Sequence, residues 1–171
     1  MLSLFVFAVT VSGMESFAYA MHRWVMHGPG WFLHASHHRV RHGRFEWNDL
    51  YAVIFAAPSI ALIYAGVQGD WGPAATSVGA GIAAYGLIYF IFHDAIVHKR
   101  LANRYVPTSV YMKRIVQAHR LHHAAVSKHG SVSFGFLYAP PVAALKRQLR
   151  ANSGDLRFRA AVGAAAENGV E

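Results

Sequence analysis

The sequence predicts an all-α, multi-pass integral membrane bundle of three spanning helices, with a histidine-rich helical cap on the cytoplasmic side. Three apolar segments are each long enough to cross ~30 Å of hydrocarbon. Of the 171 residues, 54% are hydrophobic and 14% are charged, whereas about a quarter of the residues in a soluble domain are charged. The lipid bilayer is therefore the predicted solvent for most of the chain.

The first predicted span covers residues 1–21. Its apolar sequence is interrupted by few polar residues, among them Ser3, Thr10, Ser12 and Glu15. Residues 18–20 (AYA) resemble a signal-peptide cleavage site, but a signal peptide begins with a basic region, and no Lys or Arg precedes Arg23. We therefore expect this segment to remain in the protein as a span.

The second predicted span covers residues 50–67, with Asn48 or Asp49 as its N-cap and a kink at Pro58, whose ring removes a backbone hydrogen bond. The third span covers residues 74–92. It is rich in Gly and Ala, which allow helices to approach closely in lipid.

The basic residues predict the orientation of the spans. All sixteen Lys and Arg lie in residues 23–44, 99–128 and 146–159, while the loop at 68–73 has none. Three crossings place these basic regions on one side of the membrane, and the positive-inside rule assigns that side to the cytoplasm. The net charge of +8 is thereby explained by topology, and we predict no nucleic-acid partner.

The remainder of the chain predicts shorter elements beside the spans. Residues 107–109 begin a helix over 110–124, and residues 142–150 form an amphipathic helix at the membrane interface. Residues 131–139 are apolar but too short to span, so we expect either a fourth, re-entrant segment that lines a substrate entrance or a segment that packs against the helices. Residues 1–150 are predicted as one domain, and residues 151–171 as a poorly ordered tail.

Ten of the twelve histidines occur in two copies of one arrangement, a pair five residues apart followed by an HxxHH motif. The members are His22, His27, His34, His37 and His38 in the first copy, and His93, His98, His119, His122 and His123 in the second. On a helix, positions i, i+3 and i+4 share a face. A step of five residues does not return to one face of an α-helix, so each pair is expected at a helix end or a local bulge.

This spacing predicts metal binding. The chain has no cysteine, so any metal must be held by nitrogen and oxygen, and imidazole suits Zn, Cu, Fe and Ni. Ten ligands match two ions with five each. We therefore expect each HxxHH motif to supply three ligands and its upstream pair to supply two more.

Other polar residues are predicted to support this site or to lie near it. Glu15, Glu46, Asp49 and Asp94 are candidates to orient imidazole N–H groups or to complete a metal shell, with helix caps and surface charges as the alternatives. His42 and His129 are interpreted as polar residues at the membrane surface. His42 lies four residues from His38 and could also face the cluster.

Five motifs together carry a family resemblance: HRWVMHG at 22–28, NDLYAV at 48–53, HDAIVH at 93–98, AHRLHHA at 118–124 and VSFGFLYAPP at 132–141. They resemble the membrane fatty-acid hydroxylase superfamily and, within it, the bacterial carotenoid β-ring hydroxylases, over roughly residues 14–150. The chain departs from the family pattern at two places. Arg39 and Val40 replace an acidic residue and a proline, and Ser131 replaces a cysteine.

The resemblance implies a di-iron oxygenase of the bacterial cytoplasmic membrane. Two non-haem iron ions, held by the ten histidines, would use O2 to hydroxylate carbon 3 of carotenoid β-ionone rings, with or without a 4-keto group. Reduced ferredoxin would supply electrons, and the carotenoid would enter from the bilayer. Phe134, Phe136 and Tyr138 are candidates to line the substrate site.

Four alternatives are weighed against this function. A related carotenoid ketolase or a fatty-acyl hydroxylase shares the histidine motifs, so only the surrounding sequence argues against it. A metal transporter would need polar residues along the spans, and these are nearly absent apart from Glu15. A haem electron carrier would place its histidine pairs near mid-membrane, whereas these pairs lie at the predicted helix ends.

Overall fold

The computed structural model describes residues 1–40, 43, 45–102 and 104–153, and all regular elements within these ranges are helical. The elements in chain order are α1 (Leu2–Ala20), the π-helix η1 (Met21–Met26), α2 (Trp31–His34), the 3₁₀-helix η2 (Trp47–Asp49), α3 (Leu50–Gln68), α4 (Gly72–Tyr89), the π-helix η3 (Phe90–Val97) and α5 (Val110–His122). A further helix covers residues 142–153. The predicted all-α class is confirmed.

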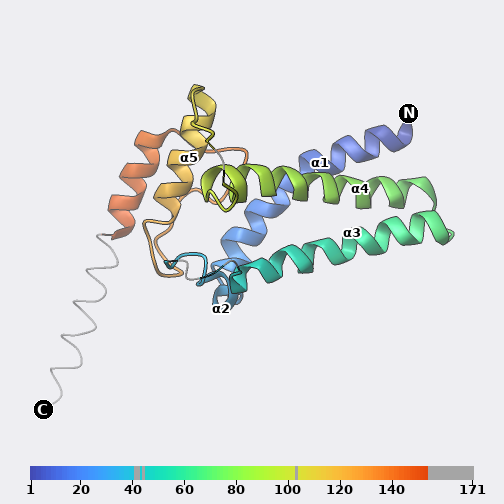
Figure 1. The fold of residues 1–171 in the computed structure, drawn as a ribbon, viewed down its shortest axis with the longest axis horizontal. Coiled ribbons are helices and arrows are strands. Elements are labelled where there is room, and N and C mark those ends of the chain that lie inside the picture. Colours follow the sequence, from blue (N-terminus) through green and yellow to red (C-terminus); the bar gives the residue numbers. More distant parts are fainter. Residues whose placement is uncertain (41–42, 44, 103, 154–171) are drawn as a thin grey trace, which may run out of the picture.

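Three helices in the described part of the chain are long and apolar enough to cross a membrane. They are Leu2–Met26, Trp47–Gln68 and Gly72–Val97, with 25, 22 and 26 residues. The three predicted spans are confirmed, and the first and third extend further than expected because a π-helix follows each of them directly. The N-terminus and the α3–α4 turn lie at one end of the bundle, and α2 and α5 lie at the other (Figure 1).

Glycine on α4 allows close contact with both other spans. A Cβ atom at Gly79 would lie 2.7 Å from the carbonyl oxygen of Ser59 on α3, and one at Gly81 would lie 2.7 Å from Cβ of Thr10 on α1. The Ser59 hydroxyl donates a hydrogen bond of 2.7 Å to the Gly79 carbonyl. Helix α4 is thereby held against α3 and α1 by near-backbone contacts, which is the role expected of small residues in lipid.

Asp49 directly precedes α3, as predicted, but its side chain caps no N–H group of that helix. A capping box joins Glu46 and Asp49: the Glu46 side chain accepts from the backbone N–H of Asp49, and the Asp49 side chain accepts from that of Glu46. The cap residue is therefore Glu46, because the 3₁₀ turn begins one turn before α3, and Asn48 is left for another role. Helix α3 continues without interruption through Pro58.

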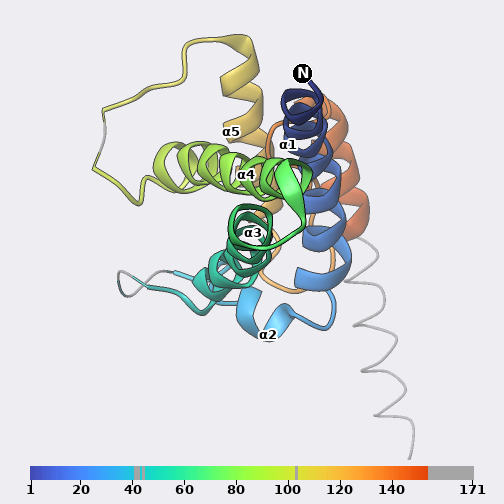
Figure 2. The same cartoon turned by 90° about the vertical axis from the view of Figure 1, so that its right-hand side faces the viewer.

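The helical start at Ser109 is confirmed, because its hydroxyl accepts a hydrogen bond of 3.2 Å from the Met112 backbone. Before this point, the connection from η3 to α5 loops out to one side of the bundle (Figure 2). Within the described residues, a small core then joins α5 to the last segments of the chain. Its buried members are Ile115, Ala118, Val132, Ala139 and Leu145.

Residues 131–139 are irregular and form no re-entrant helix. Val132 has no exposed surface, so this segment packs against the helices, as in the second of the two expectations. In the helix over residues 142–153, Leu145 is only 1% exposed. Its apolar side is therefore buried partly against protein, because α5 lies beside it. The expected tail lies, from residue 154 on, outside the described residues.

Candidate metal centre

Each upstream histidine pair is brought together by a π-helical turn. The backbone N–H of His27 donates to the carbonyl of His22 (3.0 Å), and that of His98 donates to the carbonyl of His93 (2.9 Å). These are i to i+5 hydrogen bonds, which define a π-helix. The ring centroids of the pairs consequently lie 5.2 and 4.5 Å apart. The expectation of a bulge or helix end is confirmed, because each pair spans a π turn that also ends its span.

The two HxxHH motifs have different local structures. The second lies on the last turn of α5, with His123 as the C-cap. The first is helical only to His34, and residues 35–38 form turns. The Ser36 hydroxyl donates to the Leu33 carbonyl (2.9 Å), and a serine that bonds to nearby backbone favours turns over helix. The prediction of a helix face through residues 34–38 is therefore wrong.

Eight of the histidines form two compact groups whose ligand atoms lie within 4.8 Å of one another. Group A consists of His22, His27, His34 and His122, and group B consists of His37, His93, His98 and His119. Within the groups, facing Nε2 atoms are separated by 2.8 to 3.2 Å: His22 to His34, His27 to His122, His37 to His93, and His98 to His119.

The remaining two histidines of the motifs adjoin these groups. Nε2 of His123 lies 2.8 Å from Nε2 of His119 in group B. The His38 ring stacks on that of His123 at 4.4 Å. Among the described residues, Nε2 of His38 is buried and has no hydrogen-bond partner. The structure thus brings all ten predicted residues together at one end of the spans.

The grouping differs from the expected one, because each HxxHH motif divides between the groups. His34 and His122 belong to group A, whereas His37 and His119 belong to group B. On α5, residues three apart such as His119 and His122 differ in direction by about 60°, which is enough to aim them at two neighbouring positions. Both members of each upstream pair belong to the same group. The ligand role of these residues is still a prediction.

Backbone carbonyls of residues 125–134 fix the orientation of four rings. A carbonyl can only accept, so each Nδ1 is a donor and each Nε2 carries the free lone pair. The contacts join Nδ1 of His22 to Phe134 O (2.9 Å), His27 to Lys128 O (3.1 Å), His38 to Ala125 O (2.9 Å) and His122 to Val132 O (3.0 Å).

Side-chain oxygens orient three further rings in the same way. Nδ1 of His34 donates to Asn48 Oδ1 (2.7 Å), His37 to Glu46 Oε2 (3.0 Å) and His93 to Asp94 Oδ1 (3.0 Å). Glu46 and Asp94 were candidates for this role. Asn48 was interpreted only as a helix cap, and no signal in the sequence connects it with a histidine fourteen residues earlier.

Asp49 and Glu15 influence the histidines through other residues. Asp49 accepts two hydrogen bonds from Arg100 (2.5 and 2.6 Å), which also contacts Asp94 at 3.5 Å. Glu15 accepts 2.6 Å from the Tyr85 hydroxyl. Its other oxygen accepts from the backbone N–H groups of residues 136–138 at 2.9, 2.9 and 3.2 Å. Glu15 therefore fixes the segment whose carbonyls orient His22 and His122.

Burial keeps the imidazoles neutral, which is the form that binds metals. Because a buried site disfavours the charged form, burial lowers the pKa of His34 to about 3 and the pKa of His38 to about 4. Burial likewise lowers the pKa of His98 to about 3 and that of His123 to about 2. His129 is exposed and lies in neither group, while His42 is outside the described residues.

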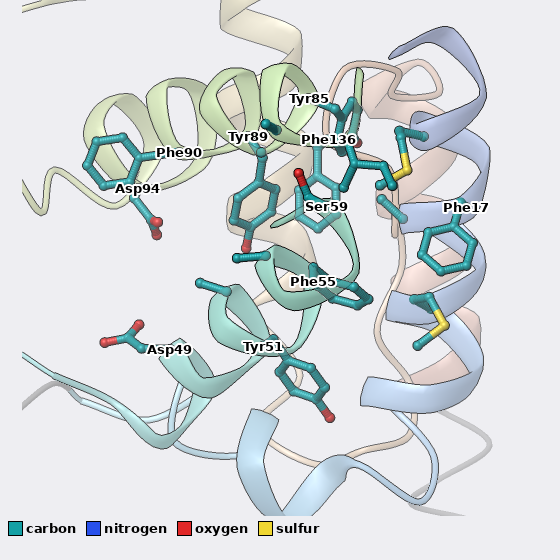
Figure 3. A pocket seen from close by; sticks show the side chains of 18 of the residues that line it. Phe17, Asp49, Tyr51, Phe55, Ser59, Tyr85, Tyr89, Phe90, Asp94 and Phe136 are labelled. Carbon is teal, nitrogen blue, oxygen red and sulfur yellow. The ribbon is translucent and has the colours of Figure 1, made fainter. Parts of the chain in front are cut away.

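An apolar cavity of about 450 Å³ lies between α1, α3 and α4 (Figure 3), and residues that contact the histidines form part of its lining. Four of its lining residues touch a histidine of a group. Asn48 and Asp94 accept from His34 and His93, and the rings of Phe136 and Tyr89 stack on His22 and His93 at 5.1 and 4.5 Å. The sequence also predicts Phe134 and Tyr138 as lining residues of the substrate site, but neither lines this cavity. Phe134 packs on the histidine rings instead, and Tyr138 is 66% exposed.

Comparisons with known proteins identify relatives of this chain. The chain is 55% identical over 146 residues to the β-carotene hydroxylase of Pantoea ananas, covering 85% of this chain and 82% of the relative. It is 47% identical over 161 residues to that of a Paracoccus species, covering 94% and 98%. A chloroplast β-carotene hydroxylase of Capsicum annuum is 38% identical over 130 residues, covering 75% of this chain and 41% of the relative.

No solved structure matches the chain. The sequence profile of the fatty acid hydroxylase family matches residues 7–139, which include most of the first span, the other two spans and all ten clustered histidines. The resemblance inferred from the motifs is thus confirmed: the chain belongs to the fatty acid hydroxylase family.

Proposed function

We propose that the protein is a membrane-bound carotenoid hydroxylase. It uses two non-haem iron ions and O2 to hydroxylate carbon 3 of β-ionone rings, converting β-carotene to β-cryptoxanthin and then to zeaxanthin. One observation carries the proposal: two adjoining groups of buried histidine Nε2 atoms lie at the end of an apolar cavity within the spans. The bacterial and plant relatives named β-carotene hydroxylase support this substrate class.

The histidine groups fit two metal ions. Where Nδ1 donates to a carbonyl or amide oxygen, Nε2 has only its lone pair, and two such atoms cannot hydrogen-bond to each other. His22 and His34 nevertheless face each other at 3.1 Å, buried from water. A cation between the facing nitrogens removes this repulsion, so group A would hold one ion and group B the other, with His38 and His123 beside them.

Among the metals that imidazole binds, the reaction requires a redox-active one, and iron is the metal that the family resemblance implies. A ring methylene has no acidic proton and no leaving group, so side-chain acids and bases cannot activate it. Iron with O2 supplies an oxidant strong enough to remove hydrogen from carbon and return a hydroxyl group. Zinc has no redox chemistry and could fill the site without supporting this reaction.

The residues of the chain position the substrate. The cavity is lined by apolar side chains of the three spans, and the aromatic rings of Phe136 and Tyr89 stack on His22 and His93. These rings separate the histidines from the cavity space with apolar surface and exclude water. A volume of about 450 Å³ accommodates the ring end of a carotenoid, while the remaining polyene extends into lipid.

The proposed setting is the bacterial inner membrane, with the histidine groups on the cytoplasmic side. The positions of the Lys and Arg residues support this orientation through the positive-inside rule. Reduced ferredoxin, a soluble electron carrier, would approach the site from that side. The 4-keto ring of canthaxanthin is a second proposed substrate, because carbon 3 of that ring is still an unsubstituted methylene.

Expression in cells that accumulate β-carotene tests the proposal. The expected result is β-cryptoxanthin and zeaxanthin in the extracted pigments, with iron bound to the purified protein. Untouched β-carotene would overturn it, provided that the protein is in the membrane, iron-loaded and supplied with reductant. His119→Ala should abolish the products while membrane insertion, measured by fractionation, stays intact.

A further inference from the structure

The spans that line the cavity contact one another in two different ways. Helix α4 approaches α3 and α1 so closely at Gly79 and Gly81 that a Cβ atom would clash with the partner helix. These seams cannot open without moving whole helices. Between α1 and α3, the ring contact is instead that of Phe17 with Phe55, whose centroids lie 6.0 Å apart with the planes at 83°.

Both rings of this pair line the cavity, as Figure 3 shows from the inside. Phe17 is also 47% exposed, so one side of its ring faces the cavity and another faces outwards. It lies within the span Leu2–Met26, where the surroundings are hydrocarbon. A residue that lines a cavity and is also exposed to lipid marks the rim of that cavity.

A long hydrocarbon needs such an opening. The cavity of about 450 Å³ is too small for a complete carotenoid, so part of the molecule must remain outside during the reaction. An exit into water would expose apolar surface at a large cost in free energy. An exit into the hydrocarbon core avoids that cost, and aromatic side chains can change rotamer without disturbing the helices that carry them.

We propose that Phe17 and Phe55 form the lipid-facing entrance through which the ring end of a long apolar substrate passes between α1 and α3. This inference rests on the proposed function and adds the route to the site. When the rings separate, the substrate ring moves past Phe136 towards the histidine groups. The polyene then occupies the gap between the two helices and continues into the bilayer.

Ile60 on α3 also lines the cavity and is 66% exposed, and Phe90 provides the competing route at another part of the rim. Phe90 lines the cavity near its histidine end and is 41% exposed. It lies at the start of η3, beside the polar residues Asp94 and Arg100, which also line the cavity. A route past Phe90 would bring the hydrocarbon across these charged side chains, which disfavours it.

The chain has no cysteine, so a single introduced thiol can be modified without background. The test uses Phe17→Cys, Phe55→Cys and Phe90→Cys, with Val53→Cys as the matched control. Val53 is on α3, is 65% exposed and does not line the cavity. In vesicles containing β-carotene, each variant is treated with a bulky lipid-soluble alkyl methanethiosulfonate. Its alkylthio group forms a disulfide with the thiol as sulfinate leaves, and dithiothreitol reverses the reaction.

Modification of Phe17→Cys or Phe55→Cys should lower the initial rate of β-carotene conversion about tenfold or more. Dithiothreitol should restore the rate, and modified Val53→Cys should match its unmodified form. Unchanged rates in both modified entrance variants would overturn the proposal, as would inhibition only in Phe90→Cys. If neither the wild-type protein nor any unmodified variant converts β-carotene, the proposed function itself fails.

A binding measurement tests the entrance without turnover. With reductant and O2 withheld, β-carotene should slow modification of the Phe55→Cys thiol, followed by mass spectrometry, and should not slow that of Val53→Cys. Equal modification rates of Phe55→Cys with and without β-carotene would overturn the proposal. The iron content of every variant should equal that of the wild-type protein, because none of these positions contacts a clustered histidine.

Discussion

Nε2 of His27 and Nε2 of His122 lie 3.2 Å apart, although the other ring nitrogen of each residue faces a backbone carbonyl. Nδ1 of His27 donates to Lys128 O at 3.1 Å, and Nδ1 of His122 donates to Val132 O at 3.0 Å. Both facing nitrogens therefore present lone pairs. The backbone thus fixes the tautomer of both rings in the form that can bind a cation between them.

Metal binding should therefore stabilise the fold. Removing iron from the detergent-solubilised protein with a chelator should lower its melting temperature, and Fe(II) should restore it. A ligand present at a hundred times its dissociation constant stabilises the native state by about 2.7 kcal/mol per site. Thermal unfolding of chelated and reloaded samples measures this effect. Identical melting curves would show that the histidine groups do not bind iron.

Neighbouring histidines of one HxxHH motif should belong to different metal sites. His122→Ala removes a member of group A, and His119→Ala removes a member of group B. Each variant should bind about half the iron of the wild-type protein, because losing one ligand from a group of four weakens mainly that site. Iron analysis of the purified variants checks this, with His129→Ala as the exposed control. Full iron content in both variants would contradict the grouping.

Asn48 should contribute to activity through His34. Asn48→Leu removes the oxygen that accepts from Nδ1 of His34 at 2.7 Å. Loss of such an outer partner typically costs 10- to 100-fold in metal affinity or activity. Asn48→Asp keeps an acceptor and should retain most of the activity. Product formation and iron content of the two variants provide the measurement, and equal losses in both would exclude the hydrogen bond as the cause.

Glu15 should stabilise the segment over residues 131–139. Glu15→Leu leaves the part-buried N–H groups of Phe136 and Leu137 without their acceptor, at about 1–3 kcal/mol each. Glu15→Gln keeps one carbonyl oxygen and should be milder. Thermal unfolding in detergent compares the variants. A melting temperature of Glu15→Leu equal to that of Glu15→Gln would contradict this role.

The spans and the histidines that cluster could be predicted from the sequence because both depend on local patterns. An apolar run of fixed length predicts a span, and the five-residue step between His22 and His27 predicts a departure from α-helix. The division of His119 and His122 between two groups could not be predicted. Their directions on the helix differ by about 60°. Whether two such residues belong to one group or to two depends on where the surrounding helices place the other histidines.

Contacts between segments far apart in the chain also could not be predicted from the sequence. The carbonyl that orients His22 belongs to Phe134, 112 positions later in the chain. Every residue has such a carbonyl, so no residue type marks it. For a related reason the sequence does not predict the contact of Asn48 with His34, or that of Glu15 with the backbone of residues 136–138. Both contacts depend on how segments distant in the chain fold against one another.

Close approach at Gly79 should be essential for the bundle. A methyl group there would meet the Ser59 carbonyl and Ile63 at less than 3.0 Å, so Gly79→Ala should destabilise the protein by about 1–3 kcal/mol through overpacking. Gly13 on α1 has no neighbour within 4 Å of such a group, so Gly13→Ala provides the control. Thermal unfolding measures both. A Gly79→Ala protein as stable as Gly13→Ala would contradict the tight seam.

The π turns at the ends of the first and third spans also change the helical phase. One additional residue rotates everything beyond it by about 100° relative to a continuous α-helix. The lipid-facing side of α1 is thereby uncoupled from the direction in which His22 and His27 point, and the same holds for α4 with His93 and His98. The face that a span turns to the lipid and the direction of its histidines can therefore be set separately. A substitution that suits the lipid-facing side need not misalign the histidines.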